Sequence, residues 1–262
     1  MIASALIGVA AVLLYVWQQG VNECNDGRRY TSCTLQPSPF HRRFHHWPAK
    51  TLMVLTWLSI PAIAVMLGSP QRALMFVALP GVFMCAVMPH TVDGPSMALA
   101  VAGSALWPEY PIAAMACSMA SGLIHERGPI FCALYGWTPW LLLGLVAVQW
   151  WTRQAYVDRN NTRDHLVGHK GIAATMIAHK PHVDMLNEGG LLWALRGIPV
   201  LAAWQGVPPS AWFALGIAYA SRLVGTDTAR FLMWAAPALL MHCDPPWWFV
   251  AAHVVTFRRI IL

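Results

Sequence analysis

Charged side chains are scarce in this chain of 262 residues: 11% of the residues are charged, whereas 57% are hydrophobic. A soluble domain usually has about 25% charged and about 45–50% apolar residues, so this composition excludes an ordinary soluble protein. Backbone polar groups in hydrocarbon must be satisfied within their own segment, which favours helices. We therefore expect an all-α, polytopic integral membrane protein with no large soluble domain.

Several motifs are also absent. The six cysteines form no CxxC pair, which argues against a zinc ribbon. No basic tail or nucleic-acid motif accompanies the net charge of +6, so we expect no nucleic-acid partner; the arginines suit lipid head groups or phosphate-bearing substrates better. The first apolar stretch lacks a basic n-region and a clear cleavage site, and there is no lipidation motif, so we expect a retained first span.

The apolar segments predict about ten transmembrane helices, within a range of about eight to twelve, because one span needs about 20 apolar residues. They cover residues 1–19, 50–68, 71–89, 93–107, 110–125, 128–151, 190–205, 207–224, 228–242 and 245–261. Together they predict a single transmembrane helical domain over 1–262, with long loops at 20–49 and 152–189. The distribution of Lys and Arg favours a cytoplasmic N-terminus, with the first loop outside. We expect the chain in a bacterial inner (plasma) membrane.

The first long loop carries acidic residues directly after the first span and arginines just before the second. Asp26, or its neighbour Glu23, could act as a general base toward an acceptor hydroxyl or hold a divalent cation; alternatively, it is a solvated loop acid. Arg42 and Arg43 could clamp a phosphate with bidentate hydrogen bonds or anchor the loop to lipid head groups. No other cofactor is indicated.

The fourth and fifth apolar segments are separated by a short proline-containing link, which predicts a tight helical hairpin. Asp93 stands at the N-terminus of the first of these helices, where it could serve as the N-cap or face an active-site cavity. Glu126 and Arg127 end the second helix, so they could pair with each other's neighbours or with Asp93 across the hairpin. Both ends of the hairpin open toward the first loop, where they can meet Asp26 at one membrane surface.

Asp227 and Arg230 are three residues apart at the start of a late apolar segment, so they share one helical face. They could form a local ion pair or bind substrate. With ten spans they would lie on the face opposite Asp93, and a different span count would bring them to the same face.

Histidines in the two long loops are spaced as metal ligands can be, in the patterns HxxxHH, HxxxH and HxxH. A metal-dependent membrane oxidoreductase is therefore one alternative, although loops on opposite faces could not share a metal. Cys24 and Cys33 share the first loop and would either pair in an oxidising compartment or stay free. The other four cysteines lie in or beside apolar segments, which predicts packed thiols.

Five short motifs follow one another in an order that resembles polytopic GT-C-type glycosyltransferase-like proteins, which use lipid-phosphate sugar donors. The motifs are VNECNDGRRY, PFHRRF, TVDGPSMALA, GLIHERGP and TDTARFLMWAAPALL, and they touch most of the length of the chain. In that family the charged couple that ends the hairpin is often Arg-Glu, whereas here the order is Glu-Arg.

The resemblance implies transfer of a sugar from a polyprenyl-phosphate donor to a lipid or cell-envelope acceptor at the membrane surface. The implied catalytic residues are Asp26, Asp93 and Glu126, and the implied substrate-binding residues are Arg42, Arg43, Arg127, Asp227 and Arg230. The expected partners are the lipid bilayer and the lipid-linked donor. A transporter or flippase-like carrier would use the same charges along a substrate path, and a non-enzymatic subunit or assembly factor would bind a membrane protein partner.

Overall fold

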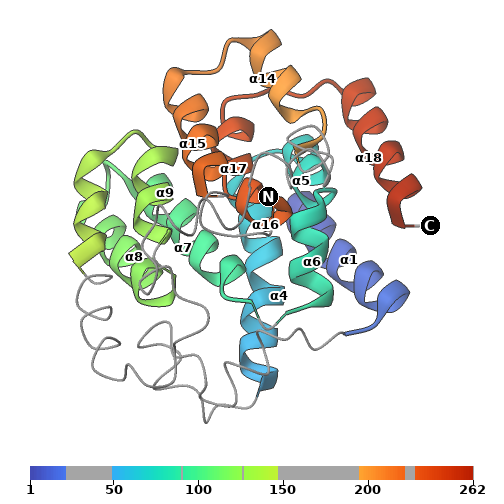
Figure 1. Cartoon of the computed structure of the whole chain (residues 1–262), viewed down its shortest axis with the longest axis horizontal. Coiled ribbons are helices and arrows are strands. Elements are labelled where there is room, and N and C mark those ends of the chain that lie inside the picture. Colours follow the sequence, from blue (N-terminus) through green and yellow to red (C-terminus); the bar gives the residue numbers. More distant parts are fainter. Residues whose placement is uncertain (22–48, 90, 126, 147–194, 222–227, 262) are drawn as a thin grey trace, which may run out of the picture. The chain divides into compact units, whose positions relative to one another are not determined.

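The computed structural model describes residues 1–21, 49–89, 91–125, 127–146, 195–221 and 228–261, and the regular elements among them are all helical (Figure 1). This confirms the expected all-α class. The elements are α1 (Ile2–Gln19), α4 (Ala49–Met66), α5 (Pro70–Val77), α6 (Pro80–Val87), α7 (Asp93–Leu106), α8 (Pro111–Ile124), α9 (Gly128–Tyr135), η1 (Pro139–Gly144), α14 (Ile198–Gln205), α15 (Pro209–Ala220), α16 (Thr228–Met233), α17 (Ala236–Leu240) and α18 (Trp247–Ile261). Most of the first long loop and all of the second lie outside the described residues.

Proline marks the beginning of many of these helices. Pro80, Pro111 and Pro209 are the first residues of α6, α8 and α15. The missing N–H of proline has no intrahelical partner at this position, and its fixed φ suits the first turn. In α5, Ser69 is the N-cap, and its hydroxyl accepts a hydrogen bond of 3.2 Å from the backbone N–H of Arg72. Proline thus sets helix boundaries inside apolar segments.

Several of the predicted spans are broken into shorter helices among the described residues. The segment 71–89 divides into α5 and α6, which are bent by 69° relative to each other. The segment 128–151 divides between α9 and η1, where Trp137 has a φ of 52°. The segment 228–242 divides into α16 and α17. Proline and left-handed backbone interrupt the i→i−4 hydrogen bonds, which hydrophobicity alone does not reveal.

Among the described residues, α1 is long and apolar enough to cross a membrane, and the bent pair α5–α6 adds a second candidate if it is counted as one span. The hairpin helices α7 and α8 have 14 residues each. Such a helix is about 21 Å long, shorter than the hydrocarbon core of about 30 Å. The expectation of about ten spans is not confirmed by these helices.

Contacts divide the chain into two compact units. Unit 1 comprises Met1–Leu14, Pro61–Met84 and Val167–Leu262, and unit 2 comprises Tyr15–Ile60 and Cys85–Leu166. In unit 1, α5 packs against α17 and α18, while α15 packs against α16 and α17. In unit 2, α7, α8, α9 and η1 pack against one another (Figure 1). A single domain over the whole chain stays a prediction.

A polar clamp in unit 1 fixes the turn between α17 and α18. The guanidinium of Arg72 donates to the carbonyl oxygens of Cys243 (2.6 Å) and Leu67 (3.3 Å) and to Oδ1 of Asp244 (2.8 Å). The Gln205 amide accepts from the backbone N–H of Asp244 at 2.7 Å and donates to its carbonyl oxygen at 2.8 Å. Cys243 is buried in this turn, and burial raises the pKa of its thiol to about 11.

Removing the guanidinium from the polar clamp is expected to expose Cys243. At neutral pH the wild-type thiol stays protonated and buried, so it reacts slowly with maleimide, which attacks the thiolate. Arg72→Ala removes three hydrogen bonds that hold the turn, so exposure of Cys243 should accelerate labelling roughly tenfold, despite the loss of the Arg72 charge that lowers the pKa of the thiol. Peptide mapping after timed labelling gives the rate at Cys243, with Cys243→Ser as the control for the site. Equal rates in wild type and Arg72→Ala would contradict a clamping role.

Candidate functional site

Asp93 is the first residue of α7 and has no exposed surface. Val92 is the N-cap of this helix, and no side-chain hydrogen bond to the cap is present in this described segment. The interpretation of Asp93 as the N-cap is therefore wrong. A carboxylate in the first turn is favoured by the helix dipole, but burying its charge costs several kcal/mol unless nearby groups compensate.

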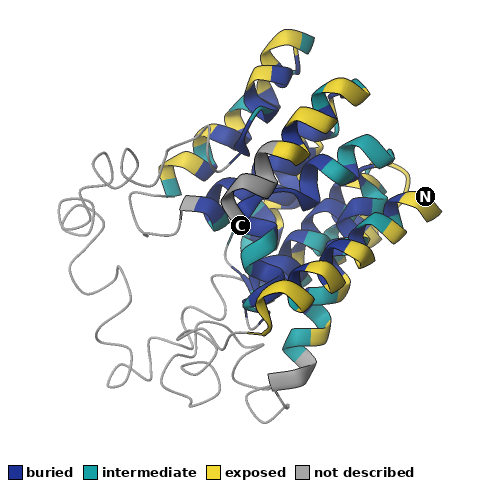
Figure 2. Ribbon diagram, turned by 90° about the vertical axis from the view of Figure 1, so that its right-hand side faces the viewer, coloured by how far each residue is buried: buried dark blue, intermediate teal, exposed yellow. Residues whose placement is uncertain are grey.

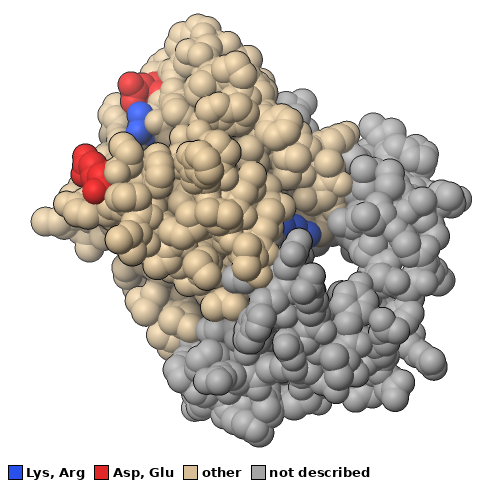
Figure 3. Space-filling model, turned by 90° about the vertical axis from the view of Figure 1, so that its left-hand side faces the viewer, with Lys and Arg blue, Asp and Glu red and all other residues tan. Residues whose placement is uncertain are grey.

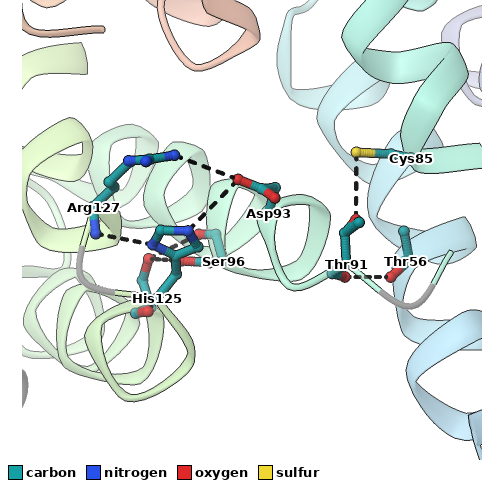
Figure 4. Close-up of polar contacts among 8 residues, drawn as sticks. Thr56, Cys85, Thr91, Asp93, Ser96, His125 and Arg127 are labelled. Carbon is teal, nitrogen blue, oxygen red and sulfur yellow. Dashed lines mark hydrogen bonds and ion pairs between the residues drawn. The ribbon is translucent and has the colours of Figure 1, made fainter. Parts of the chain in front are cut away.

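Two basic side chains lie beside this carboxylate, and we call the three residues the Asp93 cluster (Figure 4). Nε2 of His125 is 3.6 Å from Oδ1 of Asp93, and Nη1 of Arg127 is 3.9 Å from the same oxygen. The exposed fractions of the two basic side chains are only 10% and 14%. The expected approach of Arg127 to Asp93 across the hairpin is confirmed.

The helical hairpin explains why residues 32 and 34 positions apart come together. As expected, α7 and α8 pack against each other, so the residues after α8 return to the beginning of α7. His125 is the C-cap of α8, and its backbone N–H donates to the Ser121 carbonyl at 2.8 Å. Arg127 is the N-cap of α9. The Asp93 cluster therefore gathers residues from the boundaries of three helices.

One hydrogen bond determines which nitrogen of His125 faces Asp93. The backbone N–H of Arg127 donates to Nδ1 of His125 at 3.2 Å. A ring nitrogen that accepts a hydrogen bond carries no proton, so the proton of the neutral ring is on Nε2. Nε2 is also the nitrogen nearest the carboxylate, which places an N–H donor toward Asp93.

Two fully buried serines join α7 to α8 near the Asp93 cluster. The Ser96 hydroxyl donates to the Ser121 carbonyl at 3.0 Å, and the Ser121 hydroxyl donates to the Ser96 carbonyl at 2.8 Å. Gly128, the first residue of α9, lies against both side chains. A Cβ at this position would clash with the Ser121 side chain and would lie 2.7 Å from Oγ of Ser96. The close approach of α9 therefore requires glycine here.

Hydrogen bonds also fix the chain that leads into α7. The Thr56 hydroxyl on α4 donates to the Thr91 carbonyl at 3.0 Å, and the indole N–H of Trp57 donates to the Ala86 carbonyl at 2.8 Å. The Thr91 hydroxyl in turn contacts Sγ of Cys85 at 3.6 Å (Figure 4). Both ends of the segment before α7 are thus held to α4, which positions the first residue of α7.

The Asp93 cluster combines groups with complementary chemistry. A carboxylate can accept a proton or a hydroxyl hydrogen bond, and a guanidinium can bind phosphate oxygens in a bidentate manner. The separations of 3.6 and 3.9 Å are longer than a direct hydrogen bond. A small rotation of the Arg127 side chain could therefore turn its donors toward a bound anion.

Of the residues predicted to form the site, Asp93 and Arg127 come together. The predicted residues that lie outside the described part of the chain are Glu23, Asp26, Arg42, Arg43, Glu126 and Asp227. Arg230 is half-buried in the last turn of α16. It belongs to unit 1, whereas the Asp93 cluster belongs to unit 2, and its pairing with Asp227 stays a prediction.

His125 is the residue of the cluster that was not predicted from the sequence, because its position matches none of the metal-ligand spacings. The available signal was its place directly before the Glu-Arg couple in GLIHERGP. The spaced histidine pairs, together with Cys24 and Cys33, lie outside the described residues. Within the described part, no three His, Cys, Asp or Glu side chains form a group that could hold a metal ion.

The other cysteines of the chain, Cys85, Cys117, Cys132 and Cys243, are not in disulfide bonds. Three of them are buried, and Cys117 is half-buried, which confirms the expectation of packed thiols.

Comparison with known proteins gives no match. No protein-family model matches the chain, and no curated protein or solved structure matches it. The geometry and chemistry of its own residues therefore carry the functional argument.

Proposed function

We propose that this chain is a GT-C-like integral membrane glycosyltransferase that moves a sugar from a polyprenyl-phosphate donor to a lipid or cell-envelope acceptor. The observation that carries the proposal is the buried Asp93 carboxylate 3.9 Å from the guanidinium of Arg127, with His125 beside both. The two charged residues come from TVDGPSMALA and GLIHERGP, two of the motifs that resemble the GT-C-type proteins.

In the proposed reaction, the bond between the anomeric carbon and the donor phosphate oxygen breaks, and a bond from that carbon to the acceptor oxygen forms. The acceptor hydroxyl loses its proton to a carboxylate, and the lipid phosphate leaves with the negative charge. Arg127 would stabilise that charge, as preorganised donors do at developing anions. Asp93 would orient the acceptor hydroxyl and the arginines, while the carboxylate of the first loop takes the proton.

Residues outside the described part of the chain complete the proposal. Asp26 would be the general base at the membrane surface, and Glu126 a further catalytic carboxylate. Arg42 and Arg43 would share the donor phosphate with Arg127. A divalent cation could bind the acidic residues of the first loop and the phosphate.

Membrane insertion is the second part of the proposal. The exposed fractions of Leu6, Leu13 and Trp17 on α1 are 63%, 65% and 82%. Exposed positions recur along individual helices in Figure 2, and on the face drawn in Figure 3 charged side chains of the described residues form only small patches. Apolar surface of this extent suits lipid contact better than water. The proposal includes a topology of about ten spans with a cytoplasmic N-terminus. The short helices would cross the membrane as bent pairs, or at places where the bilayer becomes thinner.

Three exposed tryptophans of unit 1 are expected to lie at the head-group level of the bilayer. Trp204, Trp247 and Trp248 have exposed fractions of 66%, 57% and 66%, and the rings of Trp204 and Trp248 are 6.4 Å apart. The fluorescence of Trp204 and Trp248 is obtained by comparing the wild type with Trp204→Phe and Trp248→Phe. Lipids brominated near the head group should quench this fluorescence more strongly than lipids brominated near the bilayer centre. Stronger quenching by the deep bromines, or none by either, would contradict the placement.

A transfer assay tests the proposed function. Purified protein in proteoliposomes is given polyprenyl-phosphate donors with different labelled sugars, and mass spectrometry follows the release of polyprenyl phosphate and the labelled product. We expect turnover with one donor class. Folded protein that turns over none of them would contradict the function, and unchanged turnover in both Asp26→Asn and Asp93→Asn would contradict the assigned roles.

A carrier is the second candidate, because a buried acid next to histidine and arginine is also typical of ion and substrate paths in membranes. A flippase would move the lipid-linked sugar between leaflets without cleaving it. The same proteoliposomes distinguish the two functions: transfer releases polyprenyl phosphate, whereas carriage changes only the leaflet in which the intact donor is found.

A further inference from the structure

His125 makes contacts on both sides of its ring within the Asp93 cluster. Nδ1 accepts a hydrogen bond of 3.2 Å from the backbone N–H of Arg127, and Nε2 lies 3.6 Å from Oδ1 of Asp93. The ring therefore connects the backbone at the beginning of α9 to the carboxylate at the beginning of α7. The side chain is only 10% exposed, which leaves little room for another orientation.

We propose that His125 is a positioning residue that holds the Asp93 carboxylate and the Arg127 side chain at the relative positions that the transfer reaction needs. The inference rests on the proposed function and deepens it. Arg127 carries the phosphate-binding guanidinium, so anchoring its backbone sets where the donor phosphate binds. The N–H on Nε2 orients the carboxylate that faces the acceptor. Nδ1 is occupied by the backbone N–H of Arg127, so His125 acts through these two neighbours rather than as a base toward substrate.

Two amide side chains each reproduce one half of this geometry. In His125→Asn, the amide oxygen lies at about the position of Nδ1 and can accept from the Arg127 backbone N–H, but the side chain cannot reach Asp93. In His125→Gln, the amide nitrogen lies at about the position of Nε2 and can donate to Asp93, but no acceptor remains at the position of Nδ1. The pair of variants therefore separates the two contacts.

The two variants are therefore expected to change different kinetic parameters. His125→Asn keeps Arg127 anchored, so KM for the lipid-phosphate donor should stay near the wild-type value while kcat falls roughly three- to tenfold, because the polar contact between the ring and Asp93 is lost. His125→Gln keeps Asp93 oriented, so kcat should stay near the wild-type value while KM for the donor rises by a similar factor. His125→Ala should change both. His242 is an exposed histidine in unit 1, and its Asn and Gln variants serve as matched controls that should change neither parameter.

The kinetic experiment uses the full-length protein in proteoliposomes, with donor titrations for each variant. The split of KM and kcat between the Asn and Gln variants supports the positioning role, because a merely structural defect would lower the amount of active protein and reduce kcat in both. Parallel losses in the two variants, or wild-type kinetics in His125→Ala, would overturn the inference.

A second measurement does not depend on sugar transfer, so the inference and the proposed function can fail separately. Thermal unfolding midpoints are measured for Asp93→Asn, for each His125 variant and for the double variants. Coupling between the residues predicts that Asp93→Asn combined with His125→Ala shifts the midpoint by less than the two single shifts added together. His125→Gln, which keeps the contact, should shift the midpoint less than His125→Asn. Additive shifts would overturn the inference even if the wild type transfers sugar. Coupled shifts in a protein that transfers no sugar would contradict the proposed function, while the interaction between His125 and Asp93 would still be supported.

Discussion

Asp93→Asn is expected to slow sugar transfer about 10²- to 10⁴-fold, the usual contribution of general-base catalysis, because the reacting hydroxyl is no longer oriented toward its base. Asparagine has nearly the same shape as aspartate, so the packing of this fully buried position should be preserved. The neutral amide no longer attracts Arg127 by charge, and it is a weaker acceptor than a carboxylate for the hydrogen bond of the reacting hydroxyl. Initial rates with a labelled polyprenyl-phosphate donor give the size of the loss.

Glu109→Gln is the matched control for this variant. Glu109 is an exposed acid in the link between α7 and α8, so it belongs to the same hairpin and loses the same charge. Its transfer rate should equal that of the wild type. If Asp93→Asn keeps more than about a tenth of the wild-type rate, Asp93 does not have the catalytic role that we propose.

Gly128→Ala is expected to destabilise unit 2 by about 1–3 kcal/mol, the usual cost of overpacking a closely packed core. The added Cβ would clash with the Ser121 side chain and approach Oγ of Ser96 to 2.7 Å. Because the serine hydroxyls bond reciprocally to backbone carbonyls across α7 and α8, neither can rotate away without losing its bond. Unfolding in detergent or nanodiscs, followed by tryptophan fluorescence, measures the effect.

Gly216 provides the comparison, because it lies inside α15 and a Cβ there would have no heavy atom within 4 Å. Gly216→Ala should leave the stability unchanged or raise it by up to about 1 kcal/mol, since alanine is the better helix former. Adding Ser121→Gly to Gly128→Ala should recover part of the loss by making room for the new methyl group. A Gly128→Ala protein as stable as Gly216→Ala would contradict the packing of α9 against the hairpin.

The hairpin and its charges could be predicted because the relevant signals are local. Two apolar segments with a short proline-containing link determine α7 and α8, and a hairpin brings its two ends to one face. The proximity of Asp93 and Arg127 follows from that arrangement without any knowledge of the remaining fold. The helical class follows equally directly from the small share of charged residues.

Other features depend on information that hydrophobicity does not contain. A hydropathy pattern treats 71–89 as one span, whereas the structure has two helices bent by 69°, because backbone geometry at a proline decides where the helix breaks. The role of His125 depends on one hydrogen bond between its ring and a backbone N–H two residues later, which no sequence pattern specifies. The fit of Gly128 against Ser121 likewise becomes visible only when three helices are packed together.

The most direct test of the account is whether Asp93 and Arg127 act as one catalytic unit. Transfer rates are measured for Asp93→Asn, for Arg127→Gln, which keeps donors without the charge, and for the double variant. Residues that act as a unit are non-additive, so the double variant should be about as slow as the slower single variant. If the two rate losses instead multiply, the residues contribute independently, and a single site built from the Asp93 cluster is contradicted.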